Sequence, residues 1–583
     1  MDGNAIAVVL EEIGSLLDLT GENKFKARAF SAAARAIEKA DASPTDLAAS
    51  GALESLTGIG PVTAKVVREL VTTGRSGYYD DLRARTPAGL KALLSVPGLG
   101  AKKAKQLYDA LGVASLEDLE AAVDEGRIAG VKGFGERTQQ RIAAGIKFVH
   151  SGAGRRRLSR AVESAERILG VLRALPGVER AEITGELRRR LETVDGVDIV
   201  ASADAQACSA AVDAFMQQHG LLHQRREGER LGRARLADGL EVRFVCVPPE
   251  TFTWALWLHT GSPEHVAAIG ALAHAQGLSL SPAGISRGGD VVALTTEADL
   301  YDALGIQYVE PELREAGGHG GARIAVDLSV ARALPRLVEY TDLRGCFHCH
   351  TTYSDGKATL KEMAEGAIER GWEFLGIADH SQNASYAGGL KPSDIERQHR
   401  EIAAWNEERG TELWLLKGIE ADILADGTLD YSANAGVLES FDYVIGSVHS
   451  NFRMSKNEMT QRLLRALDDP RLTIMGHMTG RLLLSRDAYA LDVEKVIRRA
   501  ADRGVAIEIN ADPARLDLDW RWWQFAKQAG VLCAINPDAH SVRSLDNTRW
   551  GVDMARKGGL AAADVINTRD RDGLRSWLQG KHG

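Results

Sequence analysis

The chain has 583 residues, of which 44% are apolar, and its formal net charge is −9. Because a single hydrophobic core stops growing at about 250–300 residues, this length predicts several globular domains. The acidic balance excludes a surface that binds polyanions everywhere. No apolar run is long enough to span a membrane, no secretory leader is recognisable and the five cysteines are sparse, so we expect a cytoplasmic protein with no membrane partner.

Charge is distributed unevenly along the chain. Residues 1–160 carry 23 Lys and Arg against 19 Asp and Glu, a net charge of +4, so the remaining residues carry −13. The N-terminal part is therefore free to meet nucleic acid, whereas the acidic excess lies further along the chain.

An apolar-x-Gly-apolar-Gly motif followed by a helical pattern occurs three times in the N-terminal part, at Leu56–Lys65, Val96–Lys105 and Val131–Thr138. The first glycine permits a tight turn, and the second lets the N–H groups at a helix start approach a phosphate. One copy alone fits an ordinary helix-turn-helix equally well, but three copies favour sequence-independent, salt-sensitive binding to a DNA backbone. The predicted contacts are Gly58, Gly60, Gly98, Gly100, Gly133 and Gly135, with counter-charge from Lys102 and Lys103.

The segment from residue 4 to residue 152 resembles the N-terminal region of the family X DNA polymerases, both in the basic helix start Gly21–Phe30 and in the first hairpin. In members with lyase activity, a lysine one helical turn after this hairpin forms a Schiff base with an abasic sugar. Val66 stands at that place here, and the neighbouring Lys65 points about 100° away on a helix. We therefore expect weak or absent lyase activity.

Residues 159–321 resemble the palm and thumb of the same polymerases, and the motif that carries the resemblance lies in Ile183–Ile199. The family pattern is Gly-Ser-x-Arg-Arg, then Glu-Thr-x-Gly-Asp-x-Asp, with a third aspartate on the next strand. Alternate residues of a strand share a face, and the resemblance implies that these aspartates hold two Mg²⁺ ions for nucleotide transfer.

This chain departs from the family pattern at most of these positions. Asp195-Gly196 replaces Gly-Asp, which moves the first metal ligand to the wrong face, and Arg243 stands at the third aspartate. Glu186 replaces the serine that contacts the triphosphate, and Val266 replaces the nucleotide-contacting asparagine. We predict a palm that keeps its fold and has lost most of its polymerase chemistry.

Arg189 and Asp198 remain as a residual nucleotide site. One carboxylate facing one arginine favours a salt bridge over a two-metal site. A local bulge could still bring Asp195, Glu186 or Glu241 into a metal site. A manganese-dependent gap-filling polymerase, with Mg²⁺ or Mn²⁺ at the palm, therefore stays open as an alternative.

The strongest chemical signal begins at His348-Cys349-His350. In a strand these two histidines lie on one face and can share a metal ion. Further imidazoles and carboxylates follow short apolar runs, where the strands of a β/α array end and such folds collect their chemistry. One zinc ion needs only three or four ligands, so the whole set suits two or three ions. The set comprises His348, His350, Asp355, His380, Glu420, His449, His477, Asp538 and His540.

The stretch from about Leu343 to the C-terminus resembles the polymerase-and-histidinol-phosphatase (PHP) metallo-phosphoesterases. The resemblance implies a distorted (β/α)7 barrel with a trinuclear zinc or manganese site. It assigns to one ion the predicted catalytic residues, which are His348, His350, Glu420 and Asp538. It assigns Asp355, His380 and His540 to a second ion, and Glu420, His449 and His477 to the third.

A C-x-x-C pair, Cys346 and Cys349, lies beside the first histidines. An odd spacing in a strand would place the two thiols on opposite faces. We therefore interpret them as packing residues rather than as a redox or zinc pair.

The sequence predicts a multidomain chain with an all-α helix-hairpin-helix region, an α/β nucleotidyltransferase-like palm with a thumb, and a C-terminal PHP barrel. A glycine-rich segment, Gly317–Gly321, is the expected hinge between the two halves. The expected boundaries are 1–88 (lyase-like), 89–155 (fingers), 156–255 (palm), 256–320 (thumb), 321–342 (linker) and 343–583 (PHP).

The predicted function is DNA repair or processing. The N-terminal half is expected to grip DNA at gaps, nicks or 3′ ends as a monomer, and the PHP domain to hydrolyse phosphodiesters as a 3′→5′ exonuclease. The alternatives are a gap-filling polymerase with PHP proofreading and a non-catalytic DNA-end scaffold with structural metals. A small-molecule phosphatase is disfavoured because DNA-gripping hairpins would serve it no purpose.

Overall fold

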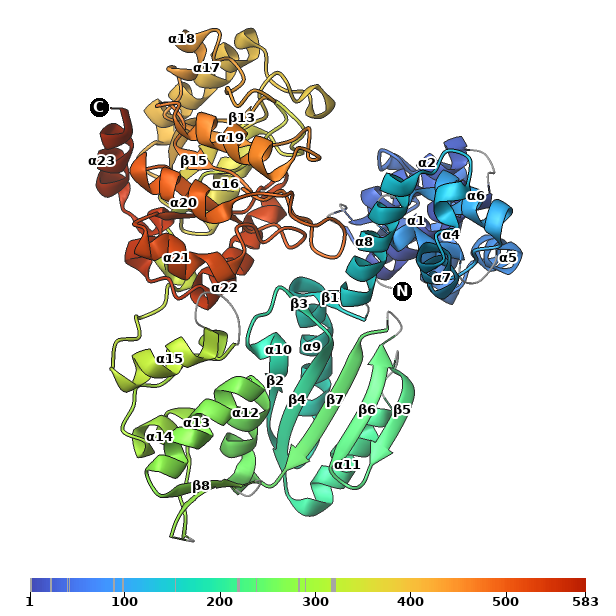
Figure 1. Ribbon diagram of the computed structural model, residues 1–583, viewed down its shortest axis with the longest axis vertical. Helices are drawn as coiled ribbons and strands as arrows, with labels where there is room; N and C mark the ends of the chain where they lie inside the picture. Colours follow the sequence, from blue (N-terminus) through green and yellow to red (C-terminus); the bar gives the residue numbers. More distant parts are fainter. Residues whose placement is uncertain are drawn as a thin grey trace. The chain divides into compact units, whose positions relative to one another are not determined.

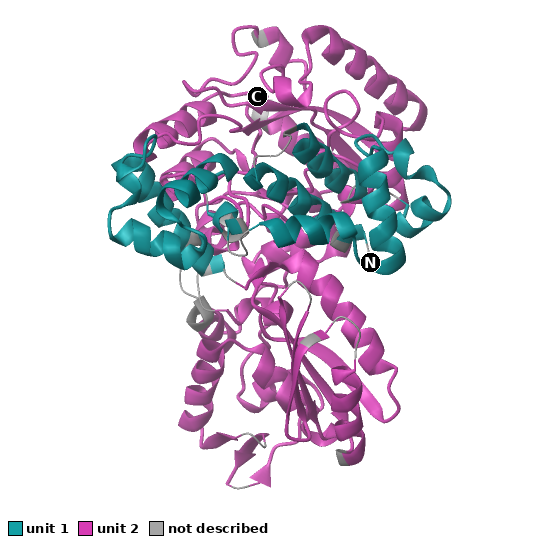
Figure 2. Ribbon diagram, turned by 90° about the vertical axis from the view of Figure 1, so that its right-hand side faces the viewer, with its two compact units in different colours: residues 1–153 teal, residues 154–583 magenta. Residues whose placement is uncertain are grey.

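The computed structural model describes residues 3–20, 24–38, 40, 42–86, 90–96, 99–152, 154–217, 221–236, 239–281, 284–288, 290–315 and 321–582. The chain divides into two compact units, residues 1–153 and residues 154–583 (Figure 2). Within the described ranges, no helix combines the length and the apolar character that crossing a membrane would require.

The first unit is all-helical around one core (Figure 1). Helices α1 and α2 lie side by side, and the buried side chains of Leu10, Ile13 and Phe30 are part of the core that they share with the later helices. The helices are α1 (Gly3–Thr20), α2 (Lys24–Glu38), α3 (Pro44–Ala49), α4 (Pro61–Thr73), α5 (Gly77–Arg85), α6 (Ala101–Leu111), α7 (Leu116–Asp124) and α8 (Glu136–Gly152).

The second unit begins with a five-stranded sheet whose order is β2-β4-β7-β6-β5. Strands β4 and β7 are parallel and the other pairs are antiparallel. Helices α9 (Leu158–Arg173) and α11 (Ala205–Met216) contribute Leu169 and Phe215 to the core of this sheet. The strands are β2 (Val178–Thr184), β4 (Gly196–Ala203), β5 (Leu221–Glu227), β6 (Leu231–Leu236) and β7 (Glu241–Val247). This is the predicted palm.

A smaller subdomain follows the palm and contains helices around the buried rings of Trp257 and Tyr301. Helix α15 lies within the segment expected as a linker, and its Ala325 and Val326 are buried in this core. Of the expected glycine hinge, only Gly321 lies among the described residues. The elements are α12 (Phe252–Thr260), α13 (Pro263–Ala275), β8 (Leu278–Ser281), β9 (Gly284–Arg287), β10 (Asp290–Val291), α14 (Glu297–Ala303) and α15 (Gly321–Val330). The domain boundaries themselves stay predictions.

The C-terminal part is a parallel seven-stranded sheet whose strands lie in sequence order. Cys349 follows the first strand and Ala539 follows the last one, and an isolated parallel bridge between these two residues closes the sheet into a barrel. The strands are β11 (Gly345–Cys346), β12 (Phe374–Ile377), β13 (Trp414–Asp422), β14 (Tyr443–Ser447), β15 (Ile474–Met475), β16 (Ala506–Asn510) and β17 (Cys533–Asn536). The helices around them are α16 (Leu360–Glu369), α17 (Pro392–Arg409), α18 (Ala435–Leu438), α19 (Lys456–Leu467), α20 (Val493–Asp502), α21 (Trp523–Gln528), α22 (Thr548–Lys557) and α23 (Arg571–His582). This confirms the predicted (β/α)7 fold.

One local prediction in the barrel is wrong. Cys346 and Cys349 were expected on opposite faces, but their Sγ atoms lie 3.5 Å apart. The reason is that β11 ends at Cys346 and the chain bends before it reaches Cys349, so the alternation of a regular strand does not apply. Both thiols are buried, in agreement with a packing role.

Candidate metal centre and nucleic-acid interface

All nine predicted ligands converge at the carboxyl ends of the barrel strands. Because parallel strands end at the same rim of a barrel, residues far apart in sequence meet there. His348, His350 and Asp355 follow β11, and His380 follows β12. Glu420 lies within β13, His449 follows β14, His477 follows β15, and Asp538 and His540 follow β17.

Glu420 is the centre of the cluster, since five imidazoles lie within 4 Å of its carboxylate, four of them within 3.3 Å. Its Oε1 lies 3.0 Å from His477 Nε2 and 3.3 Å from both His348 Nε2 and His449 Nε2. Its Oε2 lies 2.8 Å from His380 Nδ1. A buried carboxylate among imidazoles is the arrangement that a ligand shared between ions requires.

The ligand atoms form three overlapping groups in which all atoms lie within 4.8 Å of one another. The groups are His350, Asp355, His380 and His540; His348, His350 and Glu420; and His380, Glu420 and His449. The family assignment gave His350 and His380 to one ion each, whereas this geometry places each of them in two groups. Asp538 Oδ1 lies 3.2 Å from His350 Nε2, and His477 reaches the cluster through Glu420.

Several buried nitrogen and oxygen atoms of the cluster make no hydrogen bond of good geometry within the protein, although some of them lie within 4 Å of one another. They include His348 Nε2, His350 Nδ1, His380 Nδ1, His477 Nδ1 and Glu420 Oε2. Leaving such a group unsatisfied costs about 1–3 kcal/mol, and several together at one place indicate a ligand. Imidazole and carboxylate donors of this kind fit divalent zinc or manganese.

Two further carboxylates orient the histidines, and our sequence analysis missed both. Glu508 Oε1 lies 2.7 Å from His348 Nδ1, and its Oε2 accepts a hydrogen bond of 2.6 Å from the backbone N–H of His477. Asp422 Oδ1 lies 2.6 Å from His449 Nδ1. Carboxylates in this position fix the tautomer and direction of a metal-binding imidazole. For Glu508, the signal was a carboxylate in the middle of β16, whose residues are all buried. Burying an unpaired charge is costly, so a charged residue at such a position must have a partner.

The electrostatics of the cluster keep its carboxylates ionised. Burial alone would raise the pKa of Asp355, but the hydrogen bond and charge of His540, with His350 and His380, hold it at about 2. Burial would likewise raise the pKa of Glu420, whereas His449, His348 and His380 hold it well below its usual range. The carboxylates are therefore ionised at neutral pH. Burial alone would lower the pKa of the imidazoles, but the neighbouring carboxylates raise the pKa of His449 to about 10 and that of His540 to about 9.

In the palm, Arg243 stands at the position where the third family aspartate was expected to be replaced. Arg243 pairs in register with Asp198 across β4 and β7, and its Nη2 donates hydrogen bonds of 2.9 Å to Asp198 Oδ2 and 3.1 Å to Asp195 Oδ1. A Cβ atom at Gly196 would lie 3.0 Å from the same guanidinium nitrogen. The register runs unbroken from Gly196↔Glu241 to Ser202↔Val247, so β4 has no bulge against β7. Asp195, which was expected on the wrong face, nevertheless contacts the same guanidinium as Asp198, so two carboxylates meet at Arg243.

Arg189 does not face Asp198. Its side chain is 8% exposed, with Nε 2.7 Å from Glu315 Oε2 and Nη1 donating to the carbonyl of Thr260 at 2.9 Å. The buried Lys557 of the barrel donates a hydrogen bond of 2.9 Å to the backbone carbonyl of Arg189. The two predicted residual nucleotide contacts are therefore each paired elsewhere, and the structure does not bring them together.

The hairpins have the predicted form where they are described. Gly60 and Gly100 cap the N-termini of α4 and α6, and Gly135 directly precedes α8. Gly58 and Gly133 have φ values of 101° and 87°, which favour glycine. Gly98 lies outside the described residues. A Cβ at Gly60, Gly100, Gly133 or Gly135 would meet no atom within 4 Å, so the space in front of these turns is open.

The helix after the first hairpin shows the orientation on which the lyase prediction rests. Val66 is buried in the core of the unit. The side chain of Lys65 is 76% exposed, and its Nζ lies 4.0 Å from Glu69 Oε1. Lys65 therefore points to solvent on a different face from Val66, and the absence of lyase activity stays a prediction.

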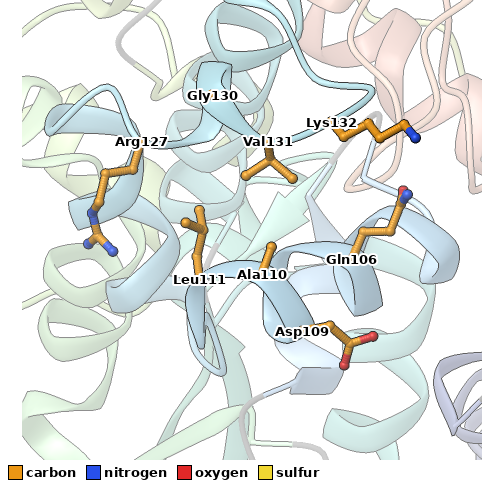
Figure 3. A pocket seen from close by; sticks show the side chains of 8 residues that line it. All are labelled: Gln106, Asp109, Ala110, Leu111, Arg127, Gly130, Val131 and Lys132. Atoms are coloured by element: carbon orange, nitrogen blue, oxygen red, sulfur yellow. The ribbon is translucent and has the colours of Figure 1, made fainter.

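A hollow of about 630 Å³ lies between the second and third hairpins (Figure 3). Figure 3 shows Val131 facing Ala110 and Leu111 across it, with the Lys132 side chain pointing to one side. Its remaining lining residues are Gln106, Asp109, Arg127 and Gly130. It adjoins the turn of the third hairpin, where a positive charge suits a phosphate backbone.

Four family models match the chain. They are a helix-hairpin-helix domain at residues 1–76, a SAM-like helix-hairpin-helix tandem at 90–147, the DNA polymerase beta thumb at 255–315 and the PHP domain at 347–512. Their order along the chain agrees with the regions described above.

Similar proteins fall into two groups. The chain is 33% identical over 575 residues to the DNA polymerase/3′-5′ exonuclease PolX of Bacillus subtilis (strain 168), covering 98% of each chain. It is 28% identical over 254 residues to a probable phosphatase of Thermoanaerobacter sp. (strain X514), covering 40% of this chain and 94% of that protein. A probable phosphatase of Syntrophotalea carbinolica is 26% identical over 242 residues, covering 38% of this chain and 90% of that protein.

Proposed function

The chain belongs to the PolX family of DNA polymerase/3′-5′ exonucleases, and from this premise we propose that it is a DNA-processing enzyme whose nuclease works and whose polymerase site is silent. The observation that carries the nuclease is the Glu420 carboxylate among five imidazoles at the rim of the barrel. The predicted polarity, 3′→5′, agrees with the printed name of the B. subtilis relative.

Two or three zinc or manganese ions held by the nine ligands would supply Lewis acidity and an activated water for phosphodiester hydrolysis. The chain's own residues prepare the site. His348, His350 and Glu420 are buried, Asp538 is half-buried beside them, and Glu508 and Asp422 hold His348 and His449 in place. Arg515, whose Nε lies 3.6 Å from Asp538 Oδ2, adds fixed positive charge that suits a phosphate.

The substrate is DNA, gripped without sequence preference at gaps, nicks or 3′ ends by the three hairpins. Open space before Gly60, Gly100 and Gly135 supports this, because a phosphate can reach the helix N-termini behind them. Lys102 is exposed and provides counter-charge. The enzyme acts in the cytoplasm as a monomer, and these two statements rest on the sequence alone.

The palm is proposed to be silent because the guanidinium of Arg243 is bonded to the one retained aspartate. A bound cation of this kind satisfies Asp198 and repels divalent metal. The competing function is manganese-dependent gap filling with PHP proofreading, for which Mg²⁺ or Mn²⁺ would have to displace Arg243. A third possibility, a DNA-end scaffold with structural metals, requires metal content without hydrolysis.

One experiment separates these functions. A primer–template with a one-nucleotide gap, labelled at the primer 5′ end, is incubated with manganese and each of the four nucleotides. Shorter products alone support the nuclease with a silent palm. Template-directed products one nucleotide longer would show that the palm works. A primer that stays unchanged although the protein binds metal would support the non-catalytic scaffold.

A further inference from the structure

An exposed tyrosine stands at the mouth of the metal cluster. The centroid of the Tyr386 ring lies 6.1 Å from that of His380 and 6.3 Å from that of His449. Both histidines belong to one of the three ligand groups. Tyr386 is nevertheless 69% exposed, which is unusual for a ring so close to buried residues.

The loop that carries Tyr386 is anchored on both sides of it. Its flanking residues Ala384 and Ala387 are buried. The backbone N–H of Asn383 donates a hydrogen bond of 2.7 Å to Asp430 Oδ2, and that of Gln382 donates one of 2.8 Å to Tyr431 Oη. The backbone is thus held while the ring faces solvent, so the exposed ring is presented by the fold rather than left by a loose loop.

We propose that Tyr386 is the stacking platform for the base of the 3′-terminal nucleotide during hydrolysis, a role that rests on the proposed nuclease function. A nucleotide whose phosphodiester lies at the metal cluster carries its base one sugar away, and the Tyr386 ring lies 6.1 Å and 6.3 Å from the rings of two candidate ligands. Aromatic rings bind bases of any sequence through their π-faces, which fits the sequence-independent grip of the hairpins. Stacking on the tyrosine requires the terminal base to leave its own helix.

Tyr386 thereby gives the site a preference for frayed or mismatched 3′ ends over paired ones. A mismatched base has already lost its pairing, so less free energy is needed to move it onto the ring. A small phosphomonoester has no base and gains nothing from the ring. The substrate class favoured by this residue is therefore a single-stranded or unpaired 3′-terminal nucleotide.

The test compares Tyr386→Ala, Tyr386→Phe and Tyr386→Trp in the full-length, metal-loaded protein, with Tyr340→Ala as a matched control. Tyr340 is 40% exposed and precedes β11, at the amino ends of the strands and away from the cluster. The readouts are metal content, kcat and KM on single strands with a normal 3′ nucleotide, and the same constants on strands with a 3′-terminal abasic sugar.

We expect Tyr386→Ala to lose about 5- to 150-fold in kcat/KM on normal ends, the range expected for one stacked base. It should lose nothing on abasic ends, while Phe, Trp and the Tyr340→Ala control stay near wild type. An equal loss on both ends, an unchanged Tyr386→Ala, loss of metal, or a Tyr386→Phe as slow as Tyr386→Ala would each overturn the proposal. A wild-type protein that degrades no DNA would instead refute the nuclease function itself.

Discussion

Arg243 and Asp198 lie opposite each other on adjacent parallel strands, and a hydrogen bond of 2.9 Å joins Nη2 of the guanidinium to Oδ2 of the carboxylate. Burial alone would lower the pKa of Arg243, but Asp198 and Asp195 raise it far above its usual range. The arginine therefore stays charged at every accessible pH. Our proposal of a silent palm rests on this fixed cation, because a guanidinium paired with the carboxylates opposes the binding of a divalent metal there.

The first prediction concerns this pair. Asp198→Asn should lower the free energy of unfolding by about 1–2 kcal/mol, because a half-buried guanidinium loses the closer of its two carboxylate partners and keeps only Asp195. Exonuclease kcat and KM should not change. Urea unfolding and the labelled-primer assay measure the two effects. If the wild type extends primers and Asp198→Asn does not, Asp198 is a metal ligand and the assignment of a silent palm is wrong.

The second prediction concerns the metal cluster. His348→Ala combined with His350→Ala should abolish hydrolysis of DNA and reduce metal content, because both imidazoles face Glu420 at the barrel rim. DNA affinity should be retained, since the hairpins lie in the other unit. His274→Ala, an exposed histidine at the end of α13, is the control and should behave as wild type. Loss of DNA binding as well would mean that these histidines serve folding.

The third prediction separates Glu508 from the ligands themselves. Glu508→Gln keeps the shape of the side chain but weakens its hold on His348 Nδ1 and on the backbone N–H of His477. Metal affinity should fall about 10- to 100-fold, as for other residues that orient metal-bound histidines. Titration against a competing chelator measures it. Glu494→Gln, exposed on α20, is the control, and equal metal affinity in both variants would refute the positioning role.

The fourth prediction is a pH dependence in the thumb. His265 is fully buried, and its Nε2 lies 2.9 Å from Tyr301 Oη. Burial, assisted by Arg314 and Arg189, lowers its pKa to about 3. The unfolded chain binds a proton at this histidine below its ordinary pKa of about 6.5, whereas the folded chain does not, so stability is lost as the pH falls.

At pH 5 this difference should remove about 2 kcal/mol of unfolding free energy relative to pH 7. His265→Gln should abolish that part of the slope, whatever its own stability at pH 7. Unfolding of wild type and variant between pH 7 and pH 5 gives the two slopes. Parallel slopes would show that His265 is protonated in the folded protein.

The fifth prediction tests the hairpins. The triple change Gly60→Ala, Gly100→Ala and Gly135→Ala places methyl groups in open space and should leave the fold intact. It should weaken DNA binding about 10- to 100-fold, because the methyl groups obstruct hydrogen bonds from helix N-termini to phosphates. Gly77→Ala, equally open and outside the hairpins, is the control. A salt dependence identical to wild type would show that these turns do not contact the backbone.

Much of the architecture and the ligand set could be predicted from the sequence, because their signals are local. The hairpin glycines are recognisable because a tight turn needs a positive φ and a phosphate needs a helix start without a side chain. The histidines are recognisable because they follow short apolar runs, and such strands end at one rim of a barrel. Glu508 was missed because a carboxylate gains meaning only when its partner is known, and His348 lies 160 residues away.

Sequence by itself determined the order of the regions, the nine candidate ligand residues that gather at the barrel rim, and the replacement of the expected palm aspartates, since these depend on residue identity and short-range spacing. Tertiary structure decided which groups meet. It placed His350 and His380 between ligand groups, turned Arg189 away to Glu315, brought Arg243 against Asp198, and left the Tyr386 ring exposed beside His380. Each of these relations is set by how distant segments pack, and packing depends on the whole chain rather than on any one motif.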